Sequence, residues 1–149
     1  MDDKFLPKTV VELEKWMKEN CFNFNNYSIN DNFIHEGYGI DKSGGLYIWY
    51  YTERGQKNNL RYFFNENEIV EYAFNEIKSN KWANIHCIGF TPDYNEHKEL
   101  ERILTEMGIY FEHNEHKSWG QTIFITNIFG RDINKVLHLK EKYYKEKHY

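Results

Sequence analysis

Two histidines separated by two residues, His113 and His116, are the side chains in this sequence that most resemble metal ligands. Glu112 and Glu115 lie beside them, so this short polar segment contains several imidazole and carboxylate groups. Both kinds of group bind Zn²⁺ in proteins. No third ligand group with matching spacing accompanies this pair. The expected state of the segment is therefore a solvated polar loop, and we predict no metal ligand and no cofactor.

Other pairs that could do chemistry have simpler interpretations. His86 and Cys87 suggest a base and a nucleophile, but neighbouring residues on a strand point to opposite faces. His97 and Glu101 share a helix face at a spacing that is common on helix surfaces. The sequence contains no glycine-rich phosphate loop, no G-x-S-x-G and no H-E-x-x-H. We therefore predict no catalytic residues and no enzyme activity.

The composition places limits on the partners of the chain. Its 149 residues predict one domain over 1–149, and no run approaches the roughly 18 apolar residues of a membrane helix. The first four residues are polar and acidic, with no apolar signal-peptide core after them, so we expect a cytoplasmic protein without a membrane partner. A net charge of -4 argues against nucleic acid as the main partner and suits a basic protein.

Four helices are predicted, over about 9–20, from 66 to about 80, from 94 to 107, and from 133 onward. Apolar residues recur on one face of each at helical spacing. Three starts match the capping box, in which an N-cap residue and a glutamate three residues later satisfy each other's free backbone N–H groups. The predicted caps are Thr9 with Glu12, Asn65 with Glu68, Asp93 with Glu96, and Asp132 without such a glutamate. Gly108 suits a left-handed C-cap, and the charged tail 140–149 is expected to fray.

The strands are predicted from alternating or continuous apolar runs between turn residues. A meander is expected over 33–40, 46–51 and 60–64, with turns at 41–45 and 53–59. A buried strand over 85–90 follows, and strands over 109–112 and 122–126 form a second hairpin across the polar tip 113–118. The predicted class is α+β, with an antiparallel sheet (meander plus second hairpin), helices packed mainly on one face, and the order α-βββ-α-β-α-ββ-α.

Three polar or aromatic features of the meander and its helix have both structural and functional interpretations. Glu53-Arg54-Gly55 is a charged hairpin turn, or it presents Arg54 to a carboxylate of a partner or of Glu68 or Glu71. The aromatic strand 47–51 is expected in the core, a stacking platform for bases being the alternative. The acidic helix face at Glu66, Glu68 and Glu71 is a solvated surface, or it meets a basic protein.

The same stretch carries a family resemblance. Tyr-Thr-Glu-Arg-Gly at 51–55, followed by Asn-Glu-Ile-Val-Glu-Tyr-Ala-Phe at 67–74 and by Ala83, resembles immunity proteins of bacterial polymorphic toxin systems, specifically the immunity protein 63 family of the contact-dependent inhibition type. In that pattern an aromatic strand ends in Glu-Arg-Gly, and a short return strand leads to an acidic helix. Asn67 stands where an acid is expected and Glu71 where an aromatic is expected. The match covers about a third of the chain.

The resemblance implies an inhibitor. Such a protein binds the C-terminal domain of a cognate toxin, for example a basic nuclease, in the cytoplasm and blocks its active site or the approach of its substrate. The contact residues expected on this basis are Glu53, Arg54, Glu66, Glu68 and Glu71, with Glu112 and Glu115 as a second acidic patch. Two alternatives stay open. One is a small metal-dependent hydrolase or nuclease using His113 and His116, and the other is a nucleic-acid or scaffold module built on the aromatic sheet.

Overall fold

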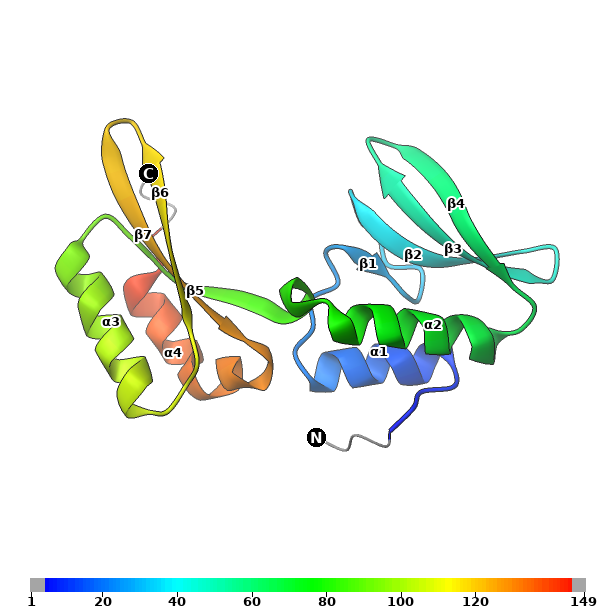
Figure 1. Ribbon diagram of the computed structural model, residues 1–149, viewed down its shortest axis with the longest axis horizontal. Helices are drawn as coiled ribbons and strands as arrows, with labels where there is room; N and C mark the ends of the chain where they lie inside the picture. Colours follow the sequence, from blue (N-terminus) through cyan, green and yellow to red (C-terminus); the bar gives the residue numbers. More distant parts are fainter. Residues whose placement is uncertain (1–4, 146–149) are drawn as a thin grey trace. The chain divides into compact units, whose positions relative to one another are not determined.

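The structure, a computed structural model, describes residues 5–145, the side chain of Ser118 excepted, as two compact units divided after Ala83 (Figure 1). Each unit has its own sheet, its own helices and its own apolar core. The predicted α+β class and the order α-βββ-α-β-α-ββ-α are confirmed, with one two-residue strand added before the meander. Folding of residues 1–149 as one domain stays a prediction.

In the first unit, two helices pack on a four-stranded sheet. Its elements are α1 (Val10–Glu19), β1 (Tyr27–Ser28), β2 (Gly37–Ser43), β3 (Leu46–Glu53), β4 (Gln56–Phe63) and α2 (Glu66–Ser79), and the 3-10 turn Lys81–Asn84 follows. The strand order is β1-β2-β3-β4, with β1 parallel to β2 and the other pairs antiparallel. Figure 1 shows α1 and α2 side by side under the sheet. Their buried faces meet the inner face of the sheet, where Leu13, Ile69 and Trp49 belong to one core.

The helix starts in this unit are fixed locally. The Thr9 hydroxyl accepts a hydrogen bond from the Glu12 N–H (3.1 Å), as the capping box requires, but the Glu12 carboxylate accepts from the Lys8 N–H (2.8 Å) and not from Thr9. At α2 the Asn65 side chain accepts from the Glu68 N–H (2.9 Å) and donates to the Glu68 carboxylate (2.6 Å). Each N-cap satisfies a backbone donor that has no partner within its helix.

The turn predicted over 53–59 exists but is shorter than predicted. β3 and β4 are joined by two residues, Arg54 and Gly55, with φ of 52° and 78°. Positive φ at both central positions is the geometry that matches the twist of paired strands. The polar residues Gln56 to Asn59 therefore belong to β4, which is an edge strand of the sheet and is exposed along nearly its whole length. A strand that faces water carries no apolar pattern for the sequence to reveal.

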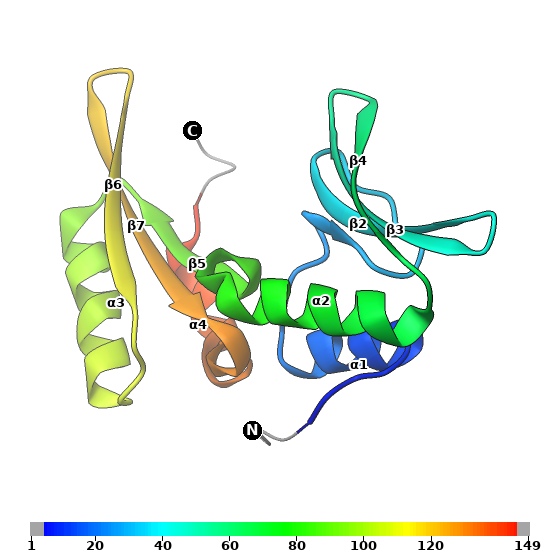
Figure 2. The ribbon, with the colours of Figure 1, turned by 45° about the vertical axis from the view of Figure 1, so that its right-hand side comes forward.

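The second unit is a three-stranded antiparallel sheet with two helices. Its elements are β5 (Ile85–Thr91), α3 (Tyr94–Glu106), β6 (Glu112–Ser118), β7 (Gln121–Phe129), the 3-10 turn Gly130–Asp132 and α4 (Ile133–Tyr143). The strand order is β5-β7-β6, so the long strand β7 lies in the middle (Figure 2). The core of the unit joins both helices to the sheet through Ile88, Leu104, Ile128 and Val136, which are fully buried.

The second hairpin is longer than predicted and shifted along the chain. Residues 109–111 precede the strand: the Ile109 N–H donates to the Leu104 carbonyl (3.0 Å), which closes the end of α3 around Gly108 at φ 72°. The segment 113–118, predicted as a tip, is strand β6, and the turn is Trp119-Gly120. The polar run at 112–118 is another outer strand and, like the start of β4, has no apolar pattern.

The last helix also corrects the prediction. Asp132 stands at the N-cap of α4, but its side chain makes no capping hydrogen bond, because the preceding 3-10 turn gives it a helical backbone conformation. Lys140–Tyr143 are helical, so fraying is wrong for this part of the tail, and residues 146–149 lie outside the described residues.

None of the helices in residues 5–145 combines the length and the apolar content needed to cross a bilayer.

Candidate functional site

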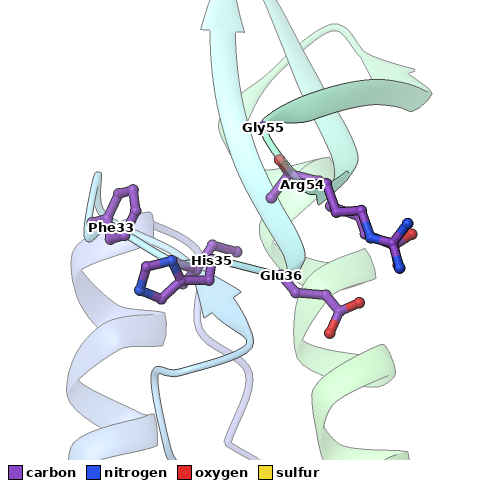
Figure 3. Close-up of a pocket in the computed structure, with 8 residues that line it drawn as sticks. Phe33, His35, Glu36, Arg54 and Gly55 are labelled. Carbon is purple, nitrogen blue, oxygen red and sulfur yellow. The ribbon is translucent and has the colours of Figure 1, made fainter.

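An open hollow of about 550 Å³ lies in the first unit, where the chain enters β2 and leaves β3. It is lined by two short segments that are far apart in sequence, Phe33–Glu36 and Thr52–Gly55. Figure 3 shows Phe33 and His35 on one side of this hollow and Glu36 and Arg54 on the other. The hollow therefore contains the Glu53-Arg54-Gly55 turn that the sequence singled out.

Backbone geometry brings the two segments together. Gly37, the first residue of β2, pairs with Thr52 near the end of β3. Its φ is 139°, and a Cβ at this position would lie 2.1 Å from the Asn26 carbonyl oxygen. Only glycine fits such a close approach of two backbone segments. Residues 33–36, immediately before Gly37, are thus held beside the β3–β4 turn.

The hollow contains charges of both signs. Glu53 and Arg54 are exposed at the turn, and no ion pair joins Arg54 to another of the described residues. Glu36, on the other lining segment, accepts a hydrogen bond through its carboxylate from the Tyr51 hydroxyl of β3 (3.4 Å). Desolvation raises the pKa of the Tyr51 hydroxyl above its ordinary value, and the negative charges of Glu36 and Glu53 raise it further. The rim is therefore acidic, with one guanidinium at its tip.

Phe33 adds an apolar surface to this rim. Its side chain is 79% exposed and makes an edge-to-face contact with the His35 ring at 4.8 Å between centroids. An exposed aromatic and an arginine beside carboxylates are typical of protein-recognition surfaces, in which a few such residues contribute most of the binding free energy. Sequence reasoning missed Phe33 and Glu36. The segment 33–36 was predicted as the start of a strand, and only the pairing of β2 with β3 brings it next to residues 52–55.

The three acidic residues predicted on the second helix have different roles. The Glu66 carboxylate accepts a hydrogen bond from the Val10 N–H at the start of α1 (3.0 Å), which joins α1 to α2. Glu68 completes the cap of α2 with Asn65. Glu71 is exposed on the water-facing side of α2. Neither Glu68 nor Glu71 pairs with Arg54 among the described contacts, so that predicted pair is not formed.

The second predicted patch is divided by the pleat of β6. Glu112 and Glu115 are separated by an odd number of positions on one strand, so their side chains point to opposite faces. The Glu112 carboxylate accepts from the Tyr110 hydroxyl (2.7 Å), while Glu115 lies 3.7 Å from His113. His113 and His116 are separated in the same way, so the pair proposed as metal ligands from sequence does not converge.

The aromatic strand behaves as predicted at its centre. Ile48, Trp49 and Tyr50 on β3 are buried, with Trp49 in the core of the unit. The Trp49 ring stacks against Tyr38 at 5.6 Å and meets the edge of Tyr72 at 5.7 Å. These contacts place Trp49 in the packed core of the first unit and leave its ring no face for stacking bases.

Comparison with known proteins identifies no relative of this chain. No family model matches the chain, and no curated protein and no solved structure matches it.

Proposed function

We propose that this protein is a toxin-neutralising inhibitor that binds the C-terminal domain of a cognate bacterial toxin in the cytoplasm. The observation that carries the proposal is the hollow with Arg54 at its tip. Arg54, which forms no ion pair with the other residues that the structure describes, stands on a two-residue turn beside an exposed phenylalanine and two carboxylates. The resemblance of residues 51–55 and 67–74 to immunity proteins supports the same function.

The physical basis of inhibition is a rigid surface with a defined charge pattern. A two-residue turn between paired strands has little backbone freedom, so the backbone at Glu53 and Arg54 loses little conformational entropy when a partner binds. The acidic rim and the net charge of -4 favour the approach of a basic partner such as a nuclease domain. Inhibition then requires only that the bound protein covers the toxin's active site or the path of its substrate, and no turnover by the inhibitor.

The decisive experiment is co-expression with the C-terminal domain of the protein encoded immediately upstream of this chain's gene. We expect the wild-type chain to restore growth and to co-purify with that domain. Growth arrest with no complex would refute the proposed function.

The variant Arg54→Asn tests the proposed surface. Asparagine tolerates positive φ, and Asn-Gly is a favoured pair for this turn, so the variant removes the guanidinium and preserves the fold. We expect about tenfold or greater weakening of toxin binding, the usual effect of losing an arginine that dominates an interface. The matched control is Lys15→Gln, which removes a cation that is 76% exposed on α1 of the same unit. Equal binding by both variants would exclude the Arg54 surface.

Phe33→Ala provides a second, independent variant of the same hollow. The Phe33 side chain is mostly exposed, so its removal leaves the core of the unit intact. Loss of binding in Phe33→Ala together with Arg54→Asn would assign both segments of the hollow to the interface. Wild-type affinity in both variants would place the interface elsewhere on the chain.

A further inference from the structure

Three side chains of the second unit converge with atoms that metal ions bind. His97 and Glu101 lie one turn apart on α3, and His113 lies on β6. The His97 Nε2 lies 2.7 Å from the His113 Nδ1 and 3.3 Å from the Glu101 Oε2, and the last two atoms are 3.5 Å apart. The three atoms thus form a small triangle of two imidazole nitrogens and one carboxylate oxygen.

The size of this triangle suits a zinc ion. Bonds of about 2.0–2.1 Å in a tetrahedral site place neighbouring ligand atoms about 3.3 Å apart. Both distances to Glu101 already match this value. The two imidazole nitrogens, which share one proton at 2.7 Å, need to separate by about 0.6 Å when a cation replaces that proton. His113 is the outer ligand, with a side chain that is 41% exposed, so it has room for this shift.

Two of the three side chains also have a hydrogen-bond partner for their second polar atom. The His97 Nδ1 lies 3.3 Å from the Thr126 hydroxyl. The second oxygen of Glu101 accepts from the Lys98 ammonium at 3.2 Å. Such outer partners fix the tautomer and orientation of metal ligands. The His113 Nε2 lies 3.7 Å from the Glu115 carboxylate, close enough for charge attraction but not for a hydrogen bond.

The surroundings of His97 hold its ring in place. The side chain is 1% exposed, and its ring stacks on Phe124 at 5.2 Å between centroids. A ligand that is already fixed loses little conformational entropy when an ion binds.

We propose that His97, Glu101 and His113 form a binding site for one Zn²⁺ ion. Two imidazoles and a carboxylate are a ligand set that zinc uses when a fourth position stays open to water or to another molecule. The exposed side of His113 is where that position would face solvent. This site replaces the pair His113 and His116 of the sequence-based hypothesis, revises the expectation of no metal ligand, and does not depend on the proposed toxin partner.

The test is titration of chelator-treated protein with ZnCl₂, followed by calorimetry and by thermal unfolding. We expect one equivalent of Zn²⁺ to bind and to raise the Tm, since a ligand that binds the folded state stabilises it. Titration with Co²⁺ gives a second readout, because tetrahedral coordination intensifies its visible absorption. A wild-type chain that binds no Zn²⁺ would overturn the proposal.

Variants at exposed or partly exposed positions identify the ligands without disrupting the core. We expect His113→Ala and Glu101→Gln each to weaken Zn²⁺ binding by well over tenfold. Glu115→Gln, which removes a charge 3.7 Å from the His113 Nε2, should weaken it less than either. His116→Ala is the matched control, since it removes a histidine from the opposite face of β6. Zinc binding that is lost in His116→Ala and kept in His113→Ala would refute the assignment.

Discussion

Glu66 offers a direct test of whether an acidic residue serves the fold or a partner. Its carboxylate accepts the Val10 N–H at 3.0 Å in a partly buried position. A hydrogen bond to a charged group contributes about 1.5–3 kcal/mol, and an anion at a helix N-terminus contributes about 0.3–1 kcal/mol. Because Glu66 is partly exposed, we expect Glu66→Ala to lower the free energy of unfolding by about 1–2 kcal/mol. Glu66→Gln keeps an acceptor oxygen and should lose less.

The assay is urea unfolding followed by tryptophan fluorescence, to which the buried Trp16 and Trp49 of the first unit contribute. Glu71→Ala is the matched control, because it removes an exposed carboxylate from the same helix and should change stability by less than about 0.5 kcal/mol. If Glu66→Ala and Glu71→Ala unfold at the same urea concentration, the link from Glu66 to Val10 contributes nothing and the reasoning is refuted.

Two further predictions concern caps and pH. Asn65→Ala should lower the free energy of unfolding by about 1 kcal/mol, because it removes the cap of α2. Asp132→Ala removes no capping hydrogen bond and should lower it by less than about 0.5 kcal/mol. Thermal unfolding measures both variants, and equal losses of stability would contradict the structure. The hydrogen bond from Lys57 lowers the pKa of Asp41, so the pair stabilises the fold above the ordinary Asp pKa of 3.8, and this contribution is lost as the pH falls through the lowered folded-state pKa. Because both side chains are nearly half exposed, we expect Asp41→Asn to lower the free energy of unfolding by no more than about 0.5 kcal/mol at pH 7. In strong acid the variant and the wild type should be equally stable. A loss of stability that persists in acid would contradict this prediction.

The sequence predicts the features that are encoded locally. Asn65 and Gly108 mark helix ends through bonds to residues three to five positions away, and both are found where expected. The polar parts of two edge strands were missed, residues 56–59 of β4 and 113–118 of β6, because residues such as Asn58 face water and follow no apolar period.

The candidate sites depend on contacts between distant parts of the chain. Glu66 meets Val10 across 56 positions, and His97 meets His113 across 16. No spacing rule connects such pairs, so sequence reasoning considered Glu66 only as a solvated or partner-binding residue and considered His113 together with His116. The turn at Arg54 was found because Arg-Gly within one hairpin is a local signal, whereas Phe33 joined it only through strand pairing.

The three two-residue turns have a consequence for how quickly the chain folds. Gly44-Gly45, Arg54-Gly55 and Trp119-Gly120 all have positive φ at both positions, so each hairpin closes with contacts between near neighbours in sequence. Isolated hairpins form in about 1–10 μs, and chains rich in local contacts fold faster than chains whose strands pair over long distances. Arg54 would then reach its final geometry early, before the slower closure of β1 onto β2 and of β5 onto β7. For the proposed inhibitor, early formation of the turn would place the contact surface at Arg54 before the rest of the unit is complete.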